Sequence, residues 1–361
     1  MWSGDIAAVG ATTRDGNAAE GLAPHEPPSL ETSLAAVAEP SVEPVVDVAI
    51  PTHGRPRYLR GAIESVLAQT FDRWRMTVSE NGPGSDELRA IIEPYLTDLR
   101  VRHIPTGSEI TAAENATSAV RAGNAPFVAV LHDDDGWDPE FLARRVAFLE
   151  SNPSCGLVFS HCNFIDPSGA LVFRRRVPLR EGLQQRNALL SLLYRKNIIV
   201  MPTVLSRRSA YERVGPAFSQ SLLFDDWEMW MRIAASSDVG FLDVFDASYR
   251  IHSEQTTHPE KARLGEHILE LLDEIDRWLP EDFPPRERRR AHSAAHFRAS
   301  YDALGRRERW KAAGHLRRAF WEYPVALFDP KMAARAVAAV RRSLTRQRRL
   351  WNAASTIDRS S

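Results

Sequence analysis

Short segments typical of strands alternate with helical patterns four times between Val45 and Glu150, and this alternation most constrains the fold. The strand candidates are residues 45–50, 75–79, 101–104 and 127–131. The stretches between and after them fit helices at 56–69, 87–95, 112–122 and 139–150. Strands that alternate with helices form a parallel sheet covered by helices on both faces. We therefore expect an α/β domain in this part of the chain.

Two of these helices begin with proline. Pro56 suits the first turn of the helix at 56–69, and Pro139 suits the first turn of the helix at 139–150. Asp138 is expected to cap the second of these helices with its side chain. Arg144 and Arg145 are expected on the solvated face of that helix.

The pattern changes after Glu150, where a mixed α+β organisation is expected. Asp166 to Gly169 separate two apolar runs and predict a hairpin. Residues 198–205 and 239–249 fit extended structure, and residues 225–235 fit a helix. Beyond His258 the chain is predicted to be helical and Arg-rich, with a Pro-rich break at 280–285.

Composition limits the partners and the compartment. The formal net charge is −1, which gives no reason to expect a nucleic-acid partner. No run of 18 apolar residues occurs, the first residues do not resemble a signal peptide, and the two cysteines are too few for a disulfide framework. A cytoplasmic protein is expected. Residues 1–44 are rich in Ala, Glu and Pro and are predicted to be a disordered leader.

Three consecutive carboxylates, Asp133 to Asp135, directly follow the apolar run at 127–131. Ligands of parallel α/β sheets bind beyond the carboxyl ends of the strands. Three adjacent carboxylates repel one another unless a positive group lies among them, and a hard divalent cation such as Mg²⁺ or Mn²⁺ prefers oxygen ligands. The alternative is a solvated acidic turn before the next helix, although Asp138 is already expected to cap that helix.

Three segments resemble family 2 glycosyltransferases of the GT-A fold. They are the opening stretch from Asp47 to Thr70, the stretch from His132 to Pro139, and the stretch from Asp225 to Arg232. They occur in the family's order and at roughly its spacing. The resemblance implies a GT-A-type, Rossmann-like, mostly parallel sheet flanked by helices over residues 45–258. Residues 259–361 would form a helical, basic C-terminal extension.

The resemblance also implies a donor nucleotide site. Pro51 and Thr52 would line the nucleotide base, and Asp133 would face the ribose. Glu80 would contact the base where the family usually has an aspartate, so this position departs from the pattern. His132 replaces the first acid of the Asp-x-Asp motif. Glu114 is assigned no role.

The remaining roles that the resemblance implies concern metal and catalysis. Asp134 would bind the metal on the diphosphate, and His252 would approach the diphosphate or the metal. Asp226 would be the general base, and Asp225 would lie on the side of the donor sugar or acceptor. Trp137 would either stack on the donor sugar or pack under the loop.

These assignments predict an inverting glycosyltransferase that moves one sugar from a nucleoside-diphosphate sugar to a hydroxyl acceptor with divalent-metal assistance. One base opposite a metal-held leaving group predicts inversion at the sugar carbon. The acceptor would be a glycan, a lipid-linked compound or a small molecule. The alternatives are a sugar-nucleotide nucleotidyltransferase and a non-catalytic scaffold that binds nucleotide sugars.

The segment from Lys331 to Leu350 carries seven basic residues and no acidic one. Apolar residues recur in it near helical spacing. A basic amphipathic helix of this kind is typical of peripheral membrane contact. The alternative is a solvated helix that docks on the catalytic domain.

Overall fold

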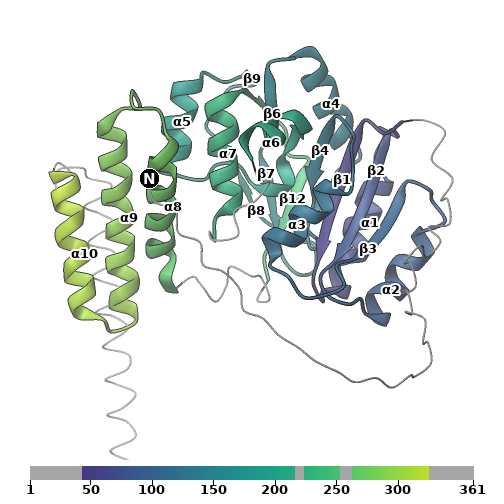
Figure 1. Ribbon diagram of the computed structural model, residues 1–361, viewed down its shortest axis with the longest axis horizontal. Coiled ribbons are helices and arrows are strands. Elements are labelled where there is room, and N and C mark those ends of the chain that lie inside the picture. Colours follow the sequence, from purple (N-terminus) through teal and green to yellow (C-terminus); the bar gives the residue numbers. More distant parts are fainter. Residues whose placement is uncertain (1–42, 216–222, 253–261, 325–361) are drawn as a thin grey trace, which may run out of the picture. The chain divides into compact units, whose positions relative to one another are not determined.

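The structure is a computed structural model that describes residues 43–215, 223–252 and 262–324 (Figure 1). Its main sheet has eight strands in the order β3-β2-β1-β4-β10-β6-β11-β9. The four predicted strands form one half of this sheet and are parallel to one another. They are β1 (Val46–Thr52), β2 (Trp74–Glu80), β3 (Val101–Pro105) and β4 (Phe127–Val130). The predicted parallel arrangement is confirmed.

Helices cover both faces of this sheet. Alternate residues of β1 fall into two different apolar clusters, with Ala49 in one and Val48 in the other. The connecting helices begin and end close to the predicted residues. They are α1 (Pro56–Leu67), α2 (Asp86–Ile92) with a 3₁₀ turn at Glu93–Tyr95, α3 (Ala112–Arg121) and α4 (Phe141–Ser151).

The other half of the sheet is mixed. β10 (Leu205–Arg207) is antiparallel to both β4 and β6 (Cys155–Ser160). β11 (Asp238–Leu242) is parallel to β6, and β9 (Gly182–Leu183) closes the edge antiparallel to β11. The helices of this half are α5 (Arg186–Arg195), α6 (Arg208–Val214) and α7 (Asp225–Ser236).

A second, four-stranded sheet has the order β5-β12-β7-β8. Its strands are β5 (Gly136–Trp137), β12 (Ala247–Arg250), β7 (Cys162–Ile165) and β8 (Leu171–Arg175). β7 and β8 form the predicted hairpin, in which Asp166 accepts hydrogen bonds from the backbone of Ser168 and Ala170 and Gly169 has φ 90°. β5 begins directly after the acidic segment, so this sheet is joined to the expected site.

The C-terminal region is helical as predicted, and its three helices lie side by side (Figure 1). They are α8 (Leu264–Trp278), α9 (Pro285–Gly305) and α10 (Arg309–Glu322), with the predicted break between α8 and α9. Tyr194 of α5 donates to Asp276 of α8 at 2.7 Å. No helix in the described ranges is both long and apolar enough to cross a bilayer. The basic segment at 331–350 and nearly all of the expected leader lie outside the described residues.

A buried carboxylate lies near the amino-terminal end of β1, where other residues of the chain neutralise it. Asp47 on β1 is 4% exposed. It accepts hydrogen bonds from Arg75 Nε at 2.9 Å, from Arg208 Nη2 at 2.7 Å and from the backbone N–H of Ala125 at 2.7 Å. A Cβ at Gly123 would lie 2.1 Å from the Asp47 carboxylate, so this turn requires glycine.

The structure corrects two predictions about secondary structure. Helix α4 begins at Phe141, and no side chain caps it. The backbone N–H of Asp138 instead donates to the carbonyl of Asp246 at 2.9 Å, which holds Asp138 beside β12 and outside the helix. Residues 198–205 are not extended throughout, because a 3₁₀ turn at Met201–Thr203 interrupts the extended backbone between Val200 and Val204, before β10.

The expected solvated position of Arg145 is wrong. Its side chain is fully buried, whereas that of Arg144 is 40% exposed. Arg145 binds both carboxylate oxygens of Asp246 at 2.9 Å, and it donates to the carbonyl of Thr203 at 3.0 Å and to Ser160 Oγ at 2.6 Å. The Arg145 guanidinium is the main group that holds the pKa of Asp246 below its ordinary value, against the opposing effect of burial.

We predict that Arg145→Met lowers the free energy of unfolding by about 3 to 5 kcal/mol, because it leaves the Asp246 carboxylate buried without its partner. Arg144→Met is the matched control, with a loss of less than about 1 kcal/mol for a partly exposed pair. Urea unfolding followed by circular dichroism measures both. Equal losses in the two variants would contradict the structural role given to Arg145.

Candidate active site

The three aspartates of the acidic segment are buried at the carboxyl end of β4. Asp133, Asp134 and Asp135 are 2%, 5% and 2% exposed. The β1–β4 register pairs Ala49 with Val130, so the end of β1 lies beside this segment. Three buried carboxylates require positive groups or hydrogen-bond donors nearby. The structure supplies these from β1, from the loop after it and from β12.

Asp133 is bonded to the end of β1. Thr52 Oγ1 donates to Asp133 Oδ2 at 2.6 Å, and Arg55 Nη1 lies 3.3 Å from Asp133 Oδ1. Burial raises the pKa of Asp133 to about 6, while Arg55 acts in the opposite direction. Thr52 and Asp133, both predicted to contact the nucleotide, are therefore in direct contact with each other.

Asp134 meets the histidine that was predicted to join it. His252 Nε2 lies 2.8 Å from Asp134 Oδ2, although 118 positions separate the two residues in the chain. Arg55 Nη1 donates to the same oxygen at 2.6 Å. Arg250 Nε donates to the carbonyl of Asp134 at 2.9 Å. The end of β12 and the loop after β1 thus converge on this residue.

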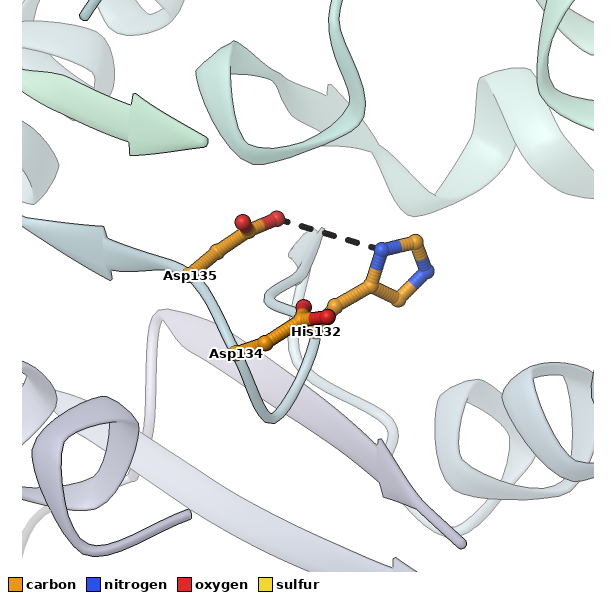
Figure 2. Close-up of side chains that lie close together, drawn as sticks. All are labelled: His132, Asp134 and Asp135. Carbon is orange, nitrogen blue, oxygen red and sulfur yellow. Dashed lines mark ion pairs between the residues drawn. The ribbon is translucent and has the colours of Figure 1, made fainter. Parts of the chain in front are cut away.

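Asp135 has one satisfied oxygen and one unsatisfied oxygen. The backbone N–H of Arg250 donates to Asp135 Oδ1 at 3.0 Å. Asp135 Oδ2 is buried without a hydrogen-bond partner and lies 3.9 Å from His132 Nδ1, the pair joined by the dashed line in Figure 2. Burial and the charge of Asp134 raise the pKa of Asp135 well above its ordinary value. A buried carboxylate oxygen without a partner fits a cation ligand.

The donor set around that oxygen suits a divalent cation. His132, Asp134 and Asp135 each offer one ligand atom, and these atoms lie within 4.8 Å of one another. Carboxylate oxygens with an imidazole nitrogen form a donor set that Mn²⁺ accepts readily and Mg²⁺ accepts through its oxygens. His132 was not assigned as a ligand from the sequence. Its position in the motif was the available signal, because histidine is itself a common metal ligand.

Glu80 lies at the end of β2, where its carboxylate already has two partners. The backbone N–H of Ser85 donates to Glu80 Oε1 at 2.6 Å, and His103 Nε2 lies 2.9 Å from Glu80 Oε2. Pro51 pairs with Ser79 across β1 and β2 and is partly exposed. The nucleotide contacts of Pro51 and Glu80 stay predictions.

Two neighbouring residues on α3 have positions that the sequence reasoning did not assign. Glu114 forms a capping box with Thr111 at the start of α3, a signature that Thr111-x-x-Glu114 carries in the sequence. Asn115 is 2% exposed and donates to the carbonyls of Thr52 at 3.2 Å and Ser79 at 3.1 Å. Asn115 therefore holds the ends of β1 and β2 together beside the site.

Trp137 packs beneath the acidic segment. It is 6% exposed, its ring stacks on Phe141 with centroids 4.1 Å apart, and its indole N–H donates to the carbonyl of Pro202 at 2.7 Å. Of the two interpretations from the sequence, this geometry favours packing over stacking on a sugar.

Asp225 and Asp226 begin α7 and are both half-buried. Asp225 accepts from the backbone N–H of Asp226 at 2.8 Å, and Asp226 accepts from that of Trp227 at 2.6 Å. Asn197 Nδ2 donates to Asp226 Oδ2 at 3.2 Å. Burial is the main cause that raises the pKa of Asp225 to about 8 and that of Asp226 to about 6.

The small sheet contacts both acidic groups. Arg250, at the end of β12, binds Asp134 and Asp135. Arg175, at the end of β8, donates to the carbonyl of Asn197 and lies close enough to Asp226 to lower its pKa. One structural unit therefore orients groups at the acidic segment and at the start of α7.

Comparison with known proteins finds a family that is similar to the part of the chain that builds this site. Residues 47–215 match the model of the family described as "Glycosyl transferase family 2". A relative from Methanocaldococcus jannaschii, "Uncharacterized glycosyltransferase MJ1057", is 23% identical over 213 residues, which are 58% of this chain and 71% of the relative. Several other curated relatives are matched over only about a third of their own length.

Two solved structures share the fold. S. aureus TarS 1-349 in complex with UDP-GlcNAc has a TM-score of 0.52 at 15% identity, covering 77% of this chain and 91% of that one. The mannosyltransferase PcManGT from Pyrobaculum calidifontis, in complex with GDP-Man and Mn²⁺, has a TM-score of 0.53 at 17% identity, covering 85% of this chain and 88% of that one. The predicted GT-A-type α/β fold is confirmed.

We predict that Asp225→Asn stabilises the protein by an amount that grows with pH. The folded-state pKa of about 8 lies above the ordinary value of 3.8, so the folded protein keeps a proton that the unfolded chain has released between these pH values. The stability of the wild type should therefore fall as pH rises through this window, and asparagine removes that loss. Urea unfolding from pH 5 to pH 9 measures the difference, and a difference that does not change with pH would contradict the assignment.

Proposed function

We propose that this chain moves a single hexose from a nucleoside-diphosphate sugar to a hydroxyl group of an acceptor, because residues 47–215 match the model of glycosyl transferase family 2. The family match supports glycosyl transfer over the nucleotidyltransferase and scaffold alternatives. The observation that carries the finer proposal is the convergence of Asp134, Asp135 and His132 around a buried carboxylate oxygen without a partner.

Residues of the acidic segment and His252, which follows β12, would hold the metal. Asp134 and Asp135 would supply oxygens, and His132 and His252 would supply nitrogens. When bound, Mg²⁺ or Mn²⁺ would neutralise charge on the departing diphosphate. Support for such a metal and donor comes from two proteins of the same fold, one in complex with GDP-Man and Mn²⁺ and one with UDP-GlcNAc.

The donor nucleotide would lie over the ends of β1 and β2. Pro51, Thr52 and Glu80 end these strands, and their positions in the sheet place them side by side. Asp133, bonded to Thr52, would face the ribose. Asn115 would hold the ends of β1 and β2 in place under the nucleotide, because it donates to a carbonyl group of each strand.

Asp226 would act as the general base. The acceptor oxygen would form a bond to the anomeric carbon while the bond from that carbon to the diphosphate oxygen breaks, and the hydroxyl proton would move to the Asp226 carboxylate. Attack opposite the leaving group inverts the configuration at that carbon. Two adjacent acids whose pKa values differ suit this division, since Asp226 (about 6) would lose its proton before Asp225 (about 8), which would lie on the acceptor side.

The acceptor would be a glycan, a lipid-linked compound or a small molecule with a free hydroxyl. Peripheral contact with an anionic membrane surface is part of the same proposal and rests on the seven basic residues at 331–350. Such contact would place the enzyme where lipid-linked acceptors are found.

We expect Asp134→Asn to remove most turnover while the protein stays folded, because the substitution takes one charge from the proposed metal site. The measurement is metal-dependent release of nucleoside diphosphate from a panel of nucleotide sugars. Asp138→Asn, four positions further along the chain, beyond β5 and exposed, is the matched control and should keep its rate. Full metal-dependent turnover in Asp134→Asn would rule out this ligand.

Asp226→Asn should keep affinity for nucleotide and metal but lose transfer by about 100-fold or more, as expected for a missing general base. The amide oxygen can still accept from the backbone of Trp227, so the start of α7 should remain intact. Calorimetric titration with UDP and GDP in the presence of Mn²⁺ is compared with transfer rates. Weakened nucleotide binding at an unchanged rate would place Asp226 on the donor side instead.

A further inference from the structure

Arg55 reaches into the acidic segment from the start of α1. It is the N-cap residue of that helix and follows Gly54, which has φ 62°. Its Nη1 atom lies 2.6 Å from Asp134 Oδ2 and 3.3 Å from Asp133 Oδ1. The Arg55 side chain is 21% exposed, whereas those two carboxylates are 7% and 3% exposed. A cation of the chain itself therefore lies on the carboxylates that the proposed function assigns to the donor and the metal.

The two donors to Asp134 Oδ2 differ in whether they can act as metal ligands. Arg55 Nη1 and His252 Nε2 approach this oxygen at 2.6 and 2.8 Å, and a carboxylate oxygen has two lone pairs to share. A divalent cation that binds this oxygen must take the place of one donor. A neutral histidine nitrogen can itself become a metal ligand, whereas an arginine stays protonated and cannot. Arg55 is therefore the donor that has to leave.

The surroundings hold the other groups in place. The His252 ring packs against the Tyr58 ring, with centroids 5.0 Å apart. The Arg250 guanidinium lies over the Tyr58 ring, 5.0 Å from its centroid. Arg250 also donates to the carbonyls of Asp134 and Asp166, each at 2.9 Å. Arg55 lies on the loop between β1 and α1, and its side chain is 21% exposed, whereas the His252 side chain is 3% exposed.

We propose that Arg55 is an exchangeable counter-cation, a positioning residue that competes with the divalent metal for Asp134 and moves to the donor diphosphate when the metal binds. This inference rests on the proposed function. A guanidinium matches two phosphate oxygens as well as it matches a carboxylate, so Arg55 gains a new anionic partner when it leaves Asp134. Arg55 thus opposes metal binding when no nucleotide is present, and it favours binding of the metal together with the nucleotide.

The proposal predicts two affinity changes of opposite sign in Arg55→Gln. Binding of Mn²⁺ without nucleotide should become tighter by on the order of 10-fold, because a charged competitor is gone. Binding of UDP and GDP at saturating Mn²⁺ should become weaker by a similar factor, because the diphosphate loses a guanidinium. A residue that only supports the fold would weaken both. Titration calorimetry on the full chain measures both affinities, and circular dichroism verifies folding.

Two further variants make the outcome decisive. Arg60→Gln on the same helix is the matched control, since Arg60 is exposed and bonds Tyr95, and both affinities should stay unchanged. Arg55→Lys keeps the charge without the planar guanidinium, so its Mn²⁺ affinity should fall between wild type and Arg55→Gln. Arg55→Lys also preserves the test if the glutamine variant does not fold.

The experiment separates this inference from the function on which it rests. Loss of Mn²⁺ binding in Asp134→Asn, with unchanged or weaker Mn²⁺ binding in Arg55→Gln and Arg55→Lys, would overturn the role of Arg55 alone. Unchanged Mn²⁺ binding in Asp134→Asn would instead overturn the proposed metal site. Tighter Mn²⁺ binding with weaker nucleotide binding in Arg55→Gln supports the exchange.

Discussion

The buried ion pair between Arg145 and Asp246 fixes the position of the candidate site. The Arg145 guanidinium binds α4 to the segment before β12, and it also reaches the carbonyl of Thr203 and the hydroxyl of Ser160. Because the carbonyl of Asp246 accepts from the backbone of Asp138, the same pair holds β5 beside β12. β12 then carries Arg250 and His252 to the acidic segment. Ion pairs this deep add little net stability compared with apolar packing, so the contribution of this one is the geometry that it imposes.

At the site itself, charges from distant parts of the chain meet at the ends of parallel strands. Arg55 follows β1, Arg250 ends β12, and both contact the aspartates that follow β4. Even with these cations the carboxylates are not fully compensated, since Asp135 keeps an oxygen without a partner. A buried polar cluster that keeps an oxygen without a hydrogen-bond partner from the chain can bind a ligand at that oxygen. This is why the acidic segment, rather than a cavity elsewhere, carries the functional proposal.

The part of the fold that could be predicted is the part with local signals. The runs at 45–50 and 127–131 are apolar, β-branched and bounded by turns, so their strands and their common edge follow from the sequence. The burial of Arg145 could not be predicted, because its partner Asp246 lies 101 positions away in the chain. The sequence of α4 contains no signal for this ion pair. Asp138 has an ideal capping sequence, but a tertiary hydrogen bond to the same distant segment uses its backbone instead. The meeting of Asp134 with His252 was expected only from the family resemblance, since spacing along the chain contains no such information.

Buried carboxylates lie at both ends of the parallel strands, but they differ in how far the chain neutralises them. This difference has a consequence for how the protein tolerates mutation. Asp47 has three donors from its own chain, so its replacement would leave Arg75 and Arg208 without their partner and weaken the fold. Asp135 is held at a cost to the fold, so a small neutral residue there would strengthen it while damaging the site. Selection for stability alone would preserve the first aspartate and erode the second. Retention of an aspartate at position 135 among homologues would therefore record selection for activity, whereas retention of Asp47 would record only the need to fold.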